Sequence, residues 1–228
     1  MFIYVAGIGT MAHAMAEECR RQDVDYMLGD KAPEQSRTDV VVIHVGGRQR
    51  LLRVIELCRK TRWPLIHAAS GLDDCLPSIE NFVVVKAPNL ALSVVAFLEM
   101  MPNLRAQARK SGITTRITVS HQLSKGTPPG TAHAIAELLD VSPSVIEKLE
   151  TRESQLAFGV QPEHLDRHSH HHVRLFQDSV CSIELKIRVN GLEEYAEGGL
   201  EIARALGARH GNLDPGYYSV PFILGWNE

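Results

Sequence analysis

Apolar residues in the first 90 positions alternate between two kinds of spacing. Short β-branched or apolar runs predict strands, with one ending near residue 28 and the others at 2–5, 39–45, 64–67 and 82–85. Between these runs, apolar positions three and four residues apart predict helices over 11–21 and 49–61. Strands and helices that alternate at short intervals form a parallel sheet with right-handed crossovers. The first part of the chain is therefore expected to be a doubly wound α/β domain.

The pattern changes in the rest of the chain. Ser142 followed by Pro143 predicts the start of a helix, and further helices are expected from the apolar spacing at 91–111, 131–139 and 198–208. A strand is expected at 114–119, and the alternation over 173–189 predicts two antiparallel strands around a turn at 177–179. A second, strand-rich α+β domain with its own helices follows from this pattern.

A glycine-containing turn joins the first predicted strand to the first predicted helix. Gly7, Gly9 and Ala12 fit the pattern G-x-G-x-x-A. In such a turn the first glycine permits the tight bend, the second lets a pyrophosphate approach the backbone, and a small third residue lets helix and strand pack closely. The turn predicts a dinucleotide site with contacts from Gly7, Ile8, Gly9, Thr10 and Met11. The alternative is that the glycines merely serve a tight turn.

Two charged residues bear on which dinucleotide is bound. Asp30 follows the turn by roughly 20 residues, at the end of the second predicted strand, where an acidic side chain can accept from a ribose hydroxyl. Lys31 beside it can instead meet a 2′-phosphate. The expected cofactor is therefore NADH or NADPH, and the sequence leaves the choice open.

The segment 120–134 carries groups expected of a substrate site. His121 precedes Lys125 by four residues, and a Pro-Pro-Gly-Thr turn that includes Gly130 and Thr131 opens the next predicted helix. A titratable imidazole, a cationic amine and the N–H groups of a helix start are suited to holding a small dicarboxylic substrate and handing it a proton. The alternatives are a structural histidine at a strand end and a solvated lysine.

Composition narrows the class of partner. The chain has 228 residues, 44% of them hydrophobic and 22% charged, and its net charge of −3 gives no sign of a nucleic-acid surface. The first residues fit a strand better than a signal peptide, and no apolar run approaches the roughly 20 residues of a membrane span. The four cysteines are scattered without a C-x-x-C pair. We expect a cytoplasmic protein with a small-molecule ligand.

Further short motifs are spread along nearly the whole chain. In chain order, the full set comprises Gly7-x-Gly9-x-Met11, the strand 39–43, Ala69-Ser70-Gly71, Ala87-Pro88-Asn89, His121-x-x-x-Lys125, Gly130-Thr131-Ala132, Tyr195-Ala196-Glu197-Gly198, Pro215-Gly216-Tyr217-Tyr218-Ser219 and Leu224-Gly225. In order and spacing they resemble the 4-hydroxy-tetrahydrodipicolinate reductases (dihydrodipicolinate reductases) of lysine biosynthesis.

The resemblance implies a reductase that passes hydride from NAD(P)H to a cyclic imine or its dehydrated precursor. It implies that His121 and Lys125 serve protonation and substrate binding. Gly130 and Thr131 would hold a carboxylate of the small dicarboxylic cyclic substrate, with Gln122 as a further substrate contact. The nicotinamide side of the cleft would be lined by Ala69, Ser70, Gly71, Ala87, Asn89 and Leu90.

The resemblance also implies a domain organisation. A Rossmann-type domain would cover residues 1–90, with 209–228 returning to it. A mixed-sheet domain at 91–208 would bind the substrate and assemble a homo-oligomer, either a tetramer or a dimer.

The substrate side departs from the family pattern. Gln122 stands where the family usually has a second histidine directly after the first. The turn from Lys125 to Thr131 is one residue shorter than in the family and lacks its Asp and Ser, which removes a hydroxyl donor from the carboxylate site. Two alternatives follow: a divergent reductase of another cyclic imine or carbonyl compound, and a non-catalytic nucleotide-binding homologue.

A group of histidines near the predicted strand pair raises the question of a metal. Imidazoles at close spacing suit zinc, nickel or copper, and here they are His164, His168, His170, His171 and His172. Successive residues of a strand point to opposite faces, so at most two of the last three can converge. We expect no metal, and instead one of these histidines in the substrate cleft with the rest exposed.

Overall fold

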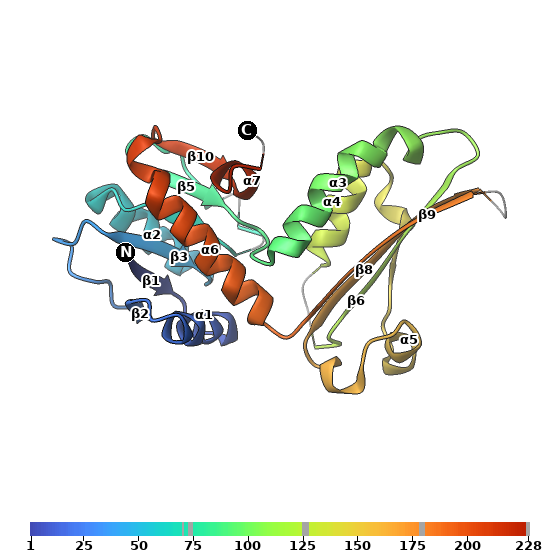
Figure 1. Cartoon of the computed structure of the whole chain (residues 1–228), viewed down its shortest axis with the longest axis horizontal. Coiled ribbons are helices and arrows are strands. Elements are labelled where there is room, and N and C mark those ends of the chain that lie inside the picture. The colour runs from blue at the N-terminus through green and yellow to red at the C-terminus, as the bar shows by residue number, and fades with distance from the viewer. Residues whose placement is uncertain (70, 73–74, 125–127, 178–180, 227–228) are drawn as a thin grey trace. The chain divides into compact units, whose positions relative to one another are not determined.

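The structure is a computed structural model, and it describes residues 1–69, 71–72, 75–124, 128–177 and 181–226. The chain divides into two compact units (Figure 1). Unit 1 comprises Met1–Leu92 and Leu192–Glu228, and unit 2 comprises Ser93–Gly191. Among the described helices, none is long and apolar enough to cross a membrane.

Unit 1 is built on a six-stranded parallel sheet with the order β10-β5-β4-β3-β1-β2. Its strands are β1 (Phe2–Ala6), β2 (Tyr26–Leu28), β3 (Val40–His44), β4 (Leu65–His67), β5 (Val83–Lys86) and β10 (Gly216–Ser219). The expected α/β class and the predicted strands are confirmed to within one or two residues at each end. Strand β10, by contrast, was not predicted.

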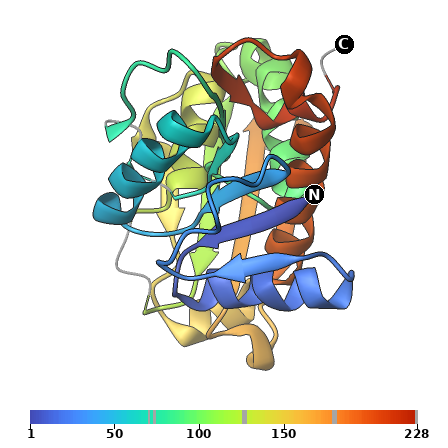
Figure 2. The same cartoon turned by 90° about the vertical axis from the view of Figure 1, so that its left-hand side faces the viewer.

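Helices cover both faces of this sheet. Helix α2 (Arg48–Thr61) packs the side chains of Leu51, Val54 and Ile55 against β1 and β3, because these apolar positions lie on one side of the helix. The opposite face carries α1 (Thr10–Arg21) and α6 (Glu193–Arg209), which contact one another, and Figures 1 and 2 show α6 running across the sheet in red. A short helix α7 (Val220–Ile223) follows β10.

Helix α6 belongs to unit 1, whereas the sequence interpretation placed residues up to 208 in the second domain. Two adjacent glycines explain the difference. A Cβ atom at Gly198 would lie 2.0 Å from the carbonyl oxygen of Leu90, and one at Gly199 would lie 2.3 Å from Cε of Met15. The α6 backbone therefore approaches both α1 and the loop after β5 more closely than any larger residue allows.

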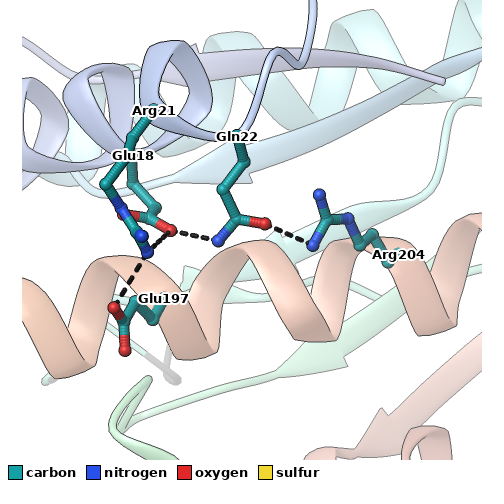
Figure 3. A network of polar contacts seen from close by, with 5 residues as sticks. All are labelled: Glu18, Arg21, Gln22, Glu197 and Arg204. Carbon is teal, nitrogen blue, oxygen red and sulfur yellow. Dashed lines mark hydrogen bonds and ion pairs between the residues drawn. The ribbon is translucent and has the colours of Figure 1, made fainter.

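A polar network also joins α6 to α1 (Figure 3). Arg21 donates to the Glu18 carboxylate at 2.7 and 2.8 Å and to Glu197 Oε1 of α6 at 2.9 Å. Gln22 donates to Glu18 and accepts from Arg204 Nη1 at 2.5 Å. Glu18 is only 7% exposed, and the hydrogen bond from Arg21 holds the pKa of its carboxyl below the usual value. These contacts fix the orientation of α1 behind the turn at Gly7–Gly9.

Unit 2 is built on a four-stranded mixed sheet with the order β7-β6-β8-β9. Its strands are β6 (Thr114–His121), β7 (Ile146–Lys148), β8 (His168–Gln177) and β9 (Cys181–Asn190), and only the β6–β7 pair is parallel. Helices α3 (Leu92–Ala108) and α4 (Gly130–Leu139) pack on one face, where Ile117, Val119 and Val173 meet Ile135. The predicted mixed-sheet α+β architecture is confirmed.

The helix predicted from Ser142 is wrong. Ser142 does cap the backbone of Ser144, but only a single turn, Pro143–Val145, forms before the chain enters β7. Ile146 takes an extended conformation and pairs with Ile117 of β6, so pairing with the sheet outweighs the local start signal. The remaining short elements of unit 2 are α5 (Arg152–Ala157) and a turn at Pro162–His164, and unit 1 has a turn at His210–Asn212.

Candidate functional site

The strand order of unit 1 reverses between β1 and β3, since β2 lies on one side of β1 and all later strands lie on the other. Ligands of open α/β sheets bind outside the carboxyl ends of the strands at such a point. The turns after the two strands touch one another, because Val45 N donates to the carbonyl oxygen of Ala6 at 3.2 Å. The predicted dinucleotide turn therefore lies at the position where this fold binds ligands.

The two glycines of the first turn have different surroundings. A Cβ atom at Gly7 would lie 2.7 Å from Val45 Cγ2 and 2.9 Å from Ala12 Cβ, so close packing requires both Gly7 and the small Ala12. At Gly9, no described atom lies within 4 Å of such a Cβ. Gly9 is the N-cap of α1 and has no side chain to bond the first N–H groups of the helix. Those groups and the exposed Ile8 border open space, which suits an anion such as a pyrophosphate.

A second glycine turn, Gly46-Gly47, follows β3 and was missed by the sequence analysis. Gly47 is the N-cap of α2, and no described atom lies within 4 Å of a Cβ placed on it. Among the described residues, no side chain caps α1 or α2, and both helices begin at the same edge of the sheet, where their dipoles favour negative charge. Two adjacent glycines directly after a buried β-branched strand were the available signal.

The charged residues beyond β2 form a cluster. Asp30, with a side chain 47% exposed, accepts from Arg50 Nε at 2.6 Å, and Arg53 Nη2 lies 3.9 Å from the same carboxylate oxygen. The hydrogen bond from Arg50 lowers the pKa of Asp30. Lys31 is exposed. Asp30 and Lys31 were predicted from the sequence, but the two arginines, which belong to the first two turns of α2, were not.

The residues expected to line the nicotinamide side lie after β4 and β5. Ala69 is half-buried, Gly71 is exposed with φ of +74°, and Ser70 lies outside the described residues. Ala87 and Leu90 are buried, so their side chains pack in the core and only their backbone can face a ligand. Asn89 Oδ1 accepts from Ala91 N at 3.1 Å, which shapes the loop that leads into α3.

A buried pair of imidazoles lies at the same edge of the sheet. His44 ends β3 and His67 ends β4, and the two residues are paired in register. Their Nδ1 atoms lie 3.2 Å apart and their rings stack at 5.3 Å, so one ring donates to the other. Burial, and then the neighbouring His67, lower the pKa of His44 to about 4. His44 is therefore neutral at pH 7.

This pair predicts acid sensitivity of unit 1. His44 stays neutral in the fold but takes up a proton near pH 6.5 once unfolded, so the unfolded state binds more protons between these pKa values. The free energy of unfolding therefore has its full value above about pH 6.5 and falls as the pH is lowered toward about 4. The total loss from His44 is about 3 kcal/mol. Denaturant unfolding measured between about pH 4 and pH 6.5, together with NMR titration of the His44 imidazole, checks this pH dependence. A His44 pKa near 6.5, or an unaltered pH slope in His44→Phe, would contradict it.

In unit 2, His121 is the last residue of β6 and is buried, with 5% exposure. It lies opposite Ser169 of β8, whose Oγ is 3.1 Å from His121 Nε2 in a hydrogen bond. The ring of His171 meets that of His121 edge-on at 5.3 Å, and Gln155 Nε2 donates to the His121 carbonyl oxygen at 2.7 Å. Ser169, His171 and Gln155 were not predicted to support His121.

The other predicted substrate contacts are placed only in part. Lys125 lies outside the described residues. Gln122 is half-buried directly after β6, Gly130 begins α4, and Thr131 is the next residue of that helix. Pro129 is the N-cap of α4 and offers no side-chain hydrogen bond, and a Cβ at Gly130 would meet no described atom within 4 Å. Gly130 N donates to the carbonyl oxygen of Pro128 at 2.9 Å, and among the described residues no side chain caps the start of α4, a position where the helix dipole favours an anion.

The expected exposure of the remaining histidines is wrong, because β8 begins at His168 and is covered: His168, His170 and His171 are buried, and His164 and His172 are half-buried. His168 and His170 are 3% and 2% exposed, and burial lowers the pKa of each. Their ring nitrogens bond Ser120 Oγ at 2.7 Å and Asn190 Oδ1 at 2.8 Å, respectively. In the part of the chain that the structure describes, no three His, Cys, Asp or Glu residues are grouped to hold a metal ion.

Comparison with known proteins gives a likeness of fold. No family model and no curated protein sequence matches the chain. Among solved structures, the dipicolinate-bound dihydrodipicolinate reductase from Paenisporosarcina sp. TG-14 is similar with a TM-score of 0.61 and 12% identity, over 96% of this chain and 97% of that one. The chain shares that protein's two-domain fold. Its fold also has a weaker likeness, with a TM-score of 0.49 and 10% identity, to the C. glutamicum DAP dehydrogenase solved with DAP, over 98% of this chain and 95% of that one.

The likeness of fold agrees with the features that each unit shows when it is considered by itself. Unit 1 has a parallel sheet, and at its point of strand reversal two helices begin at glycines that carry no capping side chain. Unit 2 has a mixed sheet that carries His121 at the end of β6, followed by α4. These features follow from this chain's own residues and do not depend on the 12% identity.

Proposed function

We propose that the protein is an NAD(P)H-dependent reductase that converts 4-hydroxy-tetrahydrodipicolinate to tetrahydrodipicolinate, as in lysine biosynthesis. The observation that carries the proposal is the edge of the sheet at β1 and β3, where two helices begin at glycines, Gly9 and Gly47, with no described side chain capping them. Support comes from the fold shared with a reductase whose structure holds dipicolinate, a cyclic dicarboxylate. The ordered motifs along the sequence agree with both.

The residues of unit 1 fit a dinucleotide. The N–H groups at the start of α1 would hold its pyrophosphate, since Gly9 leaves room for close approach. When bound, the nicotinamide supplies a hydride. The Asp30–Arg50 cluster lies beyond β2, where the adenosine ribose is bound in this class of fold.

The residues of unit 2 supply charge and a proton in the proposal. In this proposal the start of α4 at Gly130 and Thr131 holds a substrate carboxylate, and Lys125 holds the substrate as a point charge. The hydrogen bond between Ser169 Oγ and Nε2 of His121 holds the imidazole in position, and in this proposal the His121 side chain is the proton donor. His171 replaces the second histidine that the family has at the position of Gln122.

A turnover assay tests this proposal. Purified protein is mixed with NADH or NADPH and the freshly formed condensation product of aspartate semialdehyde and pyruvate, and oxidation of the nucleotide is followed. We expect oxidation that depends on both components. Oxidation with another cyclic imine and none with this one would select the divergent reductase instead. Nucleotide binding without oxidation by any imine would contradict a reductase.

A single substitution tests the nucleotide turn. Gly9→Asp places a carboxylate in the open space at the start of α1, so we expect at least tenfold weaker binding of either nucleotide through charge repulsion, roughly as for close like charges. Thermal stability should change little, because no described atom is within 4 Å of the new Cβ. Gly211→Asp is the matched control, since Gly211 is equally open but belongs to the turn His210–Asn212. Equal nucleotide affinities of wild type and Gly9→Asp would refute the placement of the pyrophosphate at the start of α1.

A further inference from the structure

We propose that Arg50 and Arg53 of α2, together with Lys31, recognise the 2′-phosphate of NADPH, so that the protein prefers NADPH to NADH. The inference rests on the proposed function, because it concerns the adenosine end of the same dinucleotide site. The sequence left the cofactor open, with Asp30 favouring NADH and Lys31 permitting NADPH. The position of two arginines beside Asp30 decides between them.

The carboxylate that would select NADH is already engaged. Arg50 Nε donates to Asp30 Oδ1 at 2.6 Å, and Arg53 Nη2 lies 3.9 Å from the same oxygen. That hydrogen bond and the charge of Arg53 lower the pKa of Asp30, so the carboxylate stays ionised and paired. A ribose hydroxyl of NADH would therefore have to compete with the Arg50 guanidinium for the Asp30 carboxylate. Asp30 consequently serves to position Arg50.

Arg50 is held in place from a second side as well. Its side chain is only 15% exposed and passes over Gly46, where an added Cβ would lie 2.8 Å from Nη1 and 2.9 Å from Cδ. Gly46 therefore makes room for the guanidinium at the carboxyl edge of β3. Nε is committed to Asp30, and among the described residues no other group accepts from Arg50, so its four terminal N–H donors are available to a ligand.

The charge of the cluster matches a phosphate. Arg50, Arg53 and Lys31 carry three positive charges against the single negative charge of Asp30, which leaves an excess of two. A phosphate monoester carries roughly −1.5 to −2 at pH 7 and offers three acceptor oxygens. A neutral 2′-hydroxyl uses none of this excess charge. Arginine is also the side chain best suited to phosphate geometry.

The test measures equilibrium binding and needs no turnover. Dissociation constants for NADPH and NADH are measured by fluorescence or calorimetry on wild type, Arg50→Gln and Arg53→Gln. Lys60→Gln is the matched control, since Lys60 lies in the last turn of the same helix and pairs with Glu56 in solvent. We expect wild type to bind NADPH at least ~10-fold more tightly than NADH, Arg50→Gln to remove most of that difference, and Lys60→Gln to preserve it.

Each remaining outcome is decisive. Equal or tighter binding of NADH by wild type overturns the inference and leaves the reductase proposal standing. An Arg50→Gln protein that weakens both nucleotides equally overturns it too. Wild type that binds neither nucleotide refutes the proposed function itself. If Arg50→Gln fails to fold, competition on wild type between 2′,5′-ADP and 5′-AMP tests the preference, because only the first carries the 2′-phosphate, and Arg53→Gln tests the part played by the cluster; tighter binding of 5′-AMP, or an unchanged preference in Arg53→Gln, overturns the inference.

Discussion

Replacing Gly198 with alanine is expected to destabilise unit 1 by about 3 kcal/mol, the upper end of the usual range for overpacking. The added Cβ would lie 2.0 Å from the carbonyl oxygen of Leu90 and 3.1 Å from Leu92 Cγ. A backbone carbonyl cannot move aside as a flexible side chain can, so either α6 or the loop after β5 must shift, and overpacking of this kind costs about 1–3 kcal/mol or more. Denaturant unfolding monitored by circular dichroism measures the loss.

Gly207→Ala is the matched control for this prediction. Gly207 belongs to the same helix, but its added Cβ would meet Met1 Sδ at 3.1 Å and Val41 Cγ2 at 3.6 Å. The Met1 side chain is flexible and can yield, while alanine favours the helix by up to about 1 kcal/mol. The free energy of unfolding of Gly207→Ala should therefore stay near that of wild type. If both variants lose the same stability, the close approach of α6 to Leu90 is not what holds this helix.

Replacing His121 with alanine is expected to lower turnover about 10²- to 10⁴-fold, the range for loss of a general acid. NADPH affinity should stay within about twofold of wild type, because His121 belongs to unit 2 and the nucleotide site to unit 1. Steady-state kinetics and nucleotide titration on the same preparations separate the two effects. His133→Ala, on the exposed side of α4, is the control and should retain full turnover.

Ser169→Ala distinguishes a proton donor from a structural histidine at this position. The variant removes the hydrogen bond to His121 Nε2 but leaves the imidazole in place. If His121 transfers a proton, the pH profile of turnover should shift while the protein stays folded. A profile identical to wild type, or full turnover in a stable His121→Ala variant, would refute the catalytic assignment.

The sequence predicted most of unit 1 because its signals are local. β-branched runs such as Val40–His44 form strands wherever a sheet buries them, and Gly7, Gly9 and Ala12 specify their turn within six residues. The helix expected after Ser142 failed for the opposite reason. Its start signal was real, but the pairing of Ile146 with β6 is a long-range interaction that no local pattern contains.

The parts of the site that escaped prediction depend on strand order and register. Arg50 meets Asp30 only because β2 and β3 lie on either side of β1, which places the start of α2 near the end of β2. His171 meets His121 only through the antiparallel register of β8 on β6. The α6 boundary failed likewise, since the close approach of Gly198 to Leu90 joins residues far apart in the sequence.

The most direct test of the central claim follows the transferred hydrogen. NADPH carrying deuterium on the transferring carbon of the nicotinamide is incubated with the protein and the fresh condensation product of aspartate semialdehyde and pyruvate, and the cyclic product is analysed by mass spectrometry. The account predicts one deuterium per molecule of tetrahydrodipicolinate and an equal amount of oxidised nucleotide. Oxidised nucleotide without deuterium in the product, or no reaction by protein that binds NADPH, would contradict it.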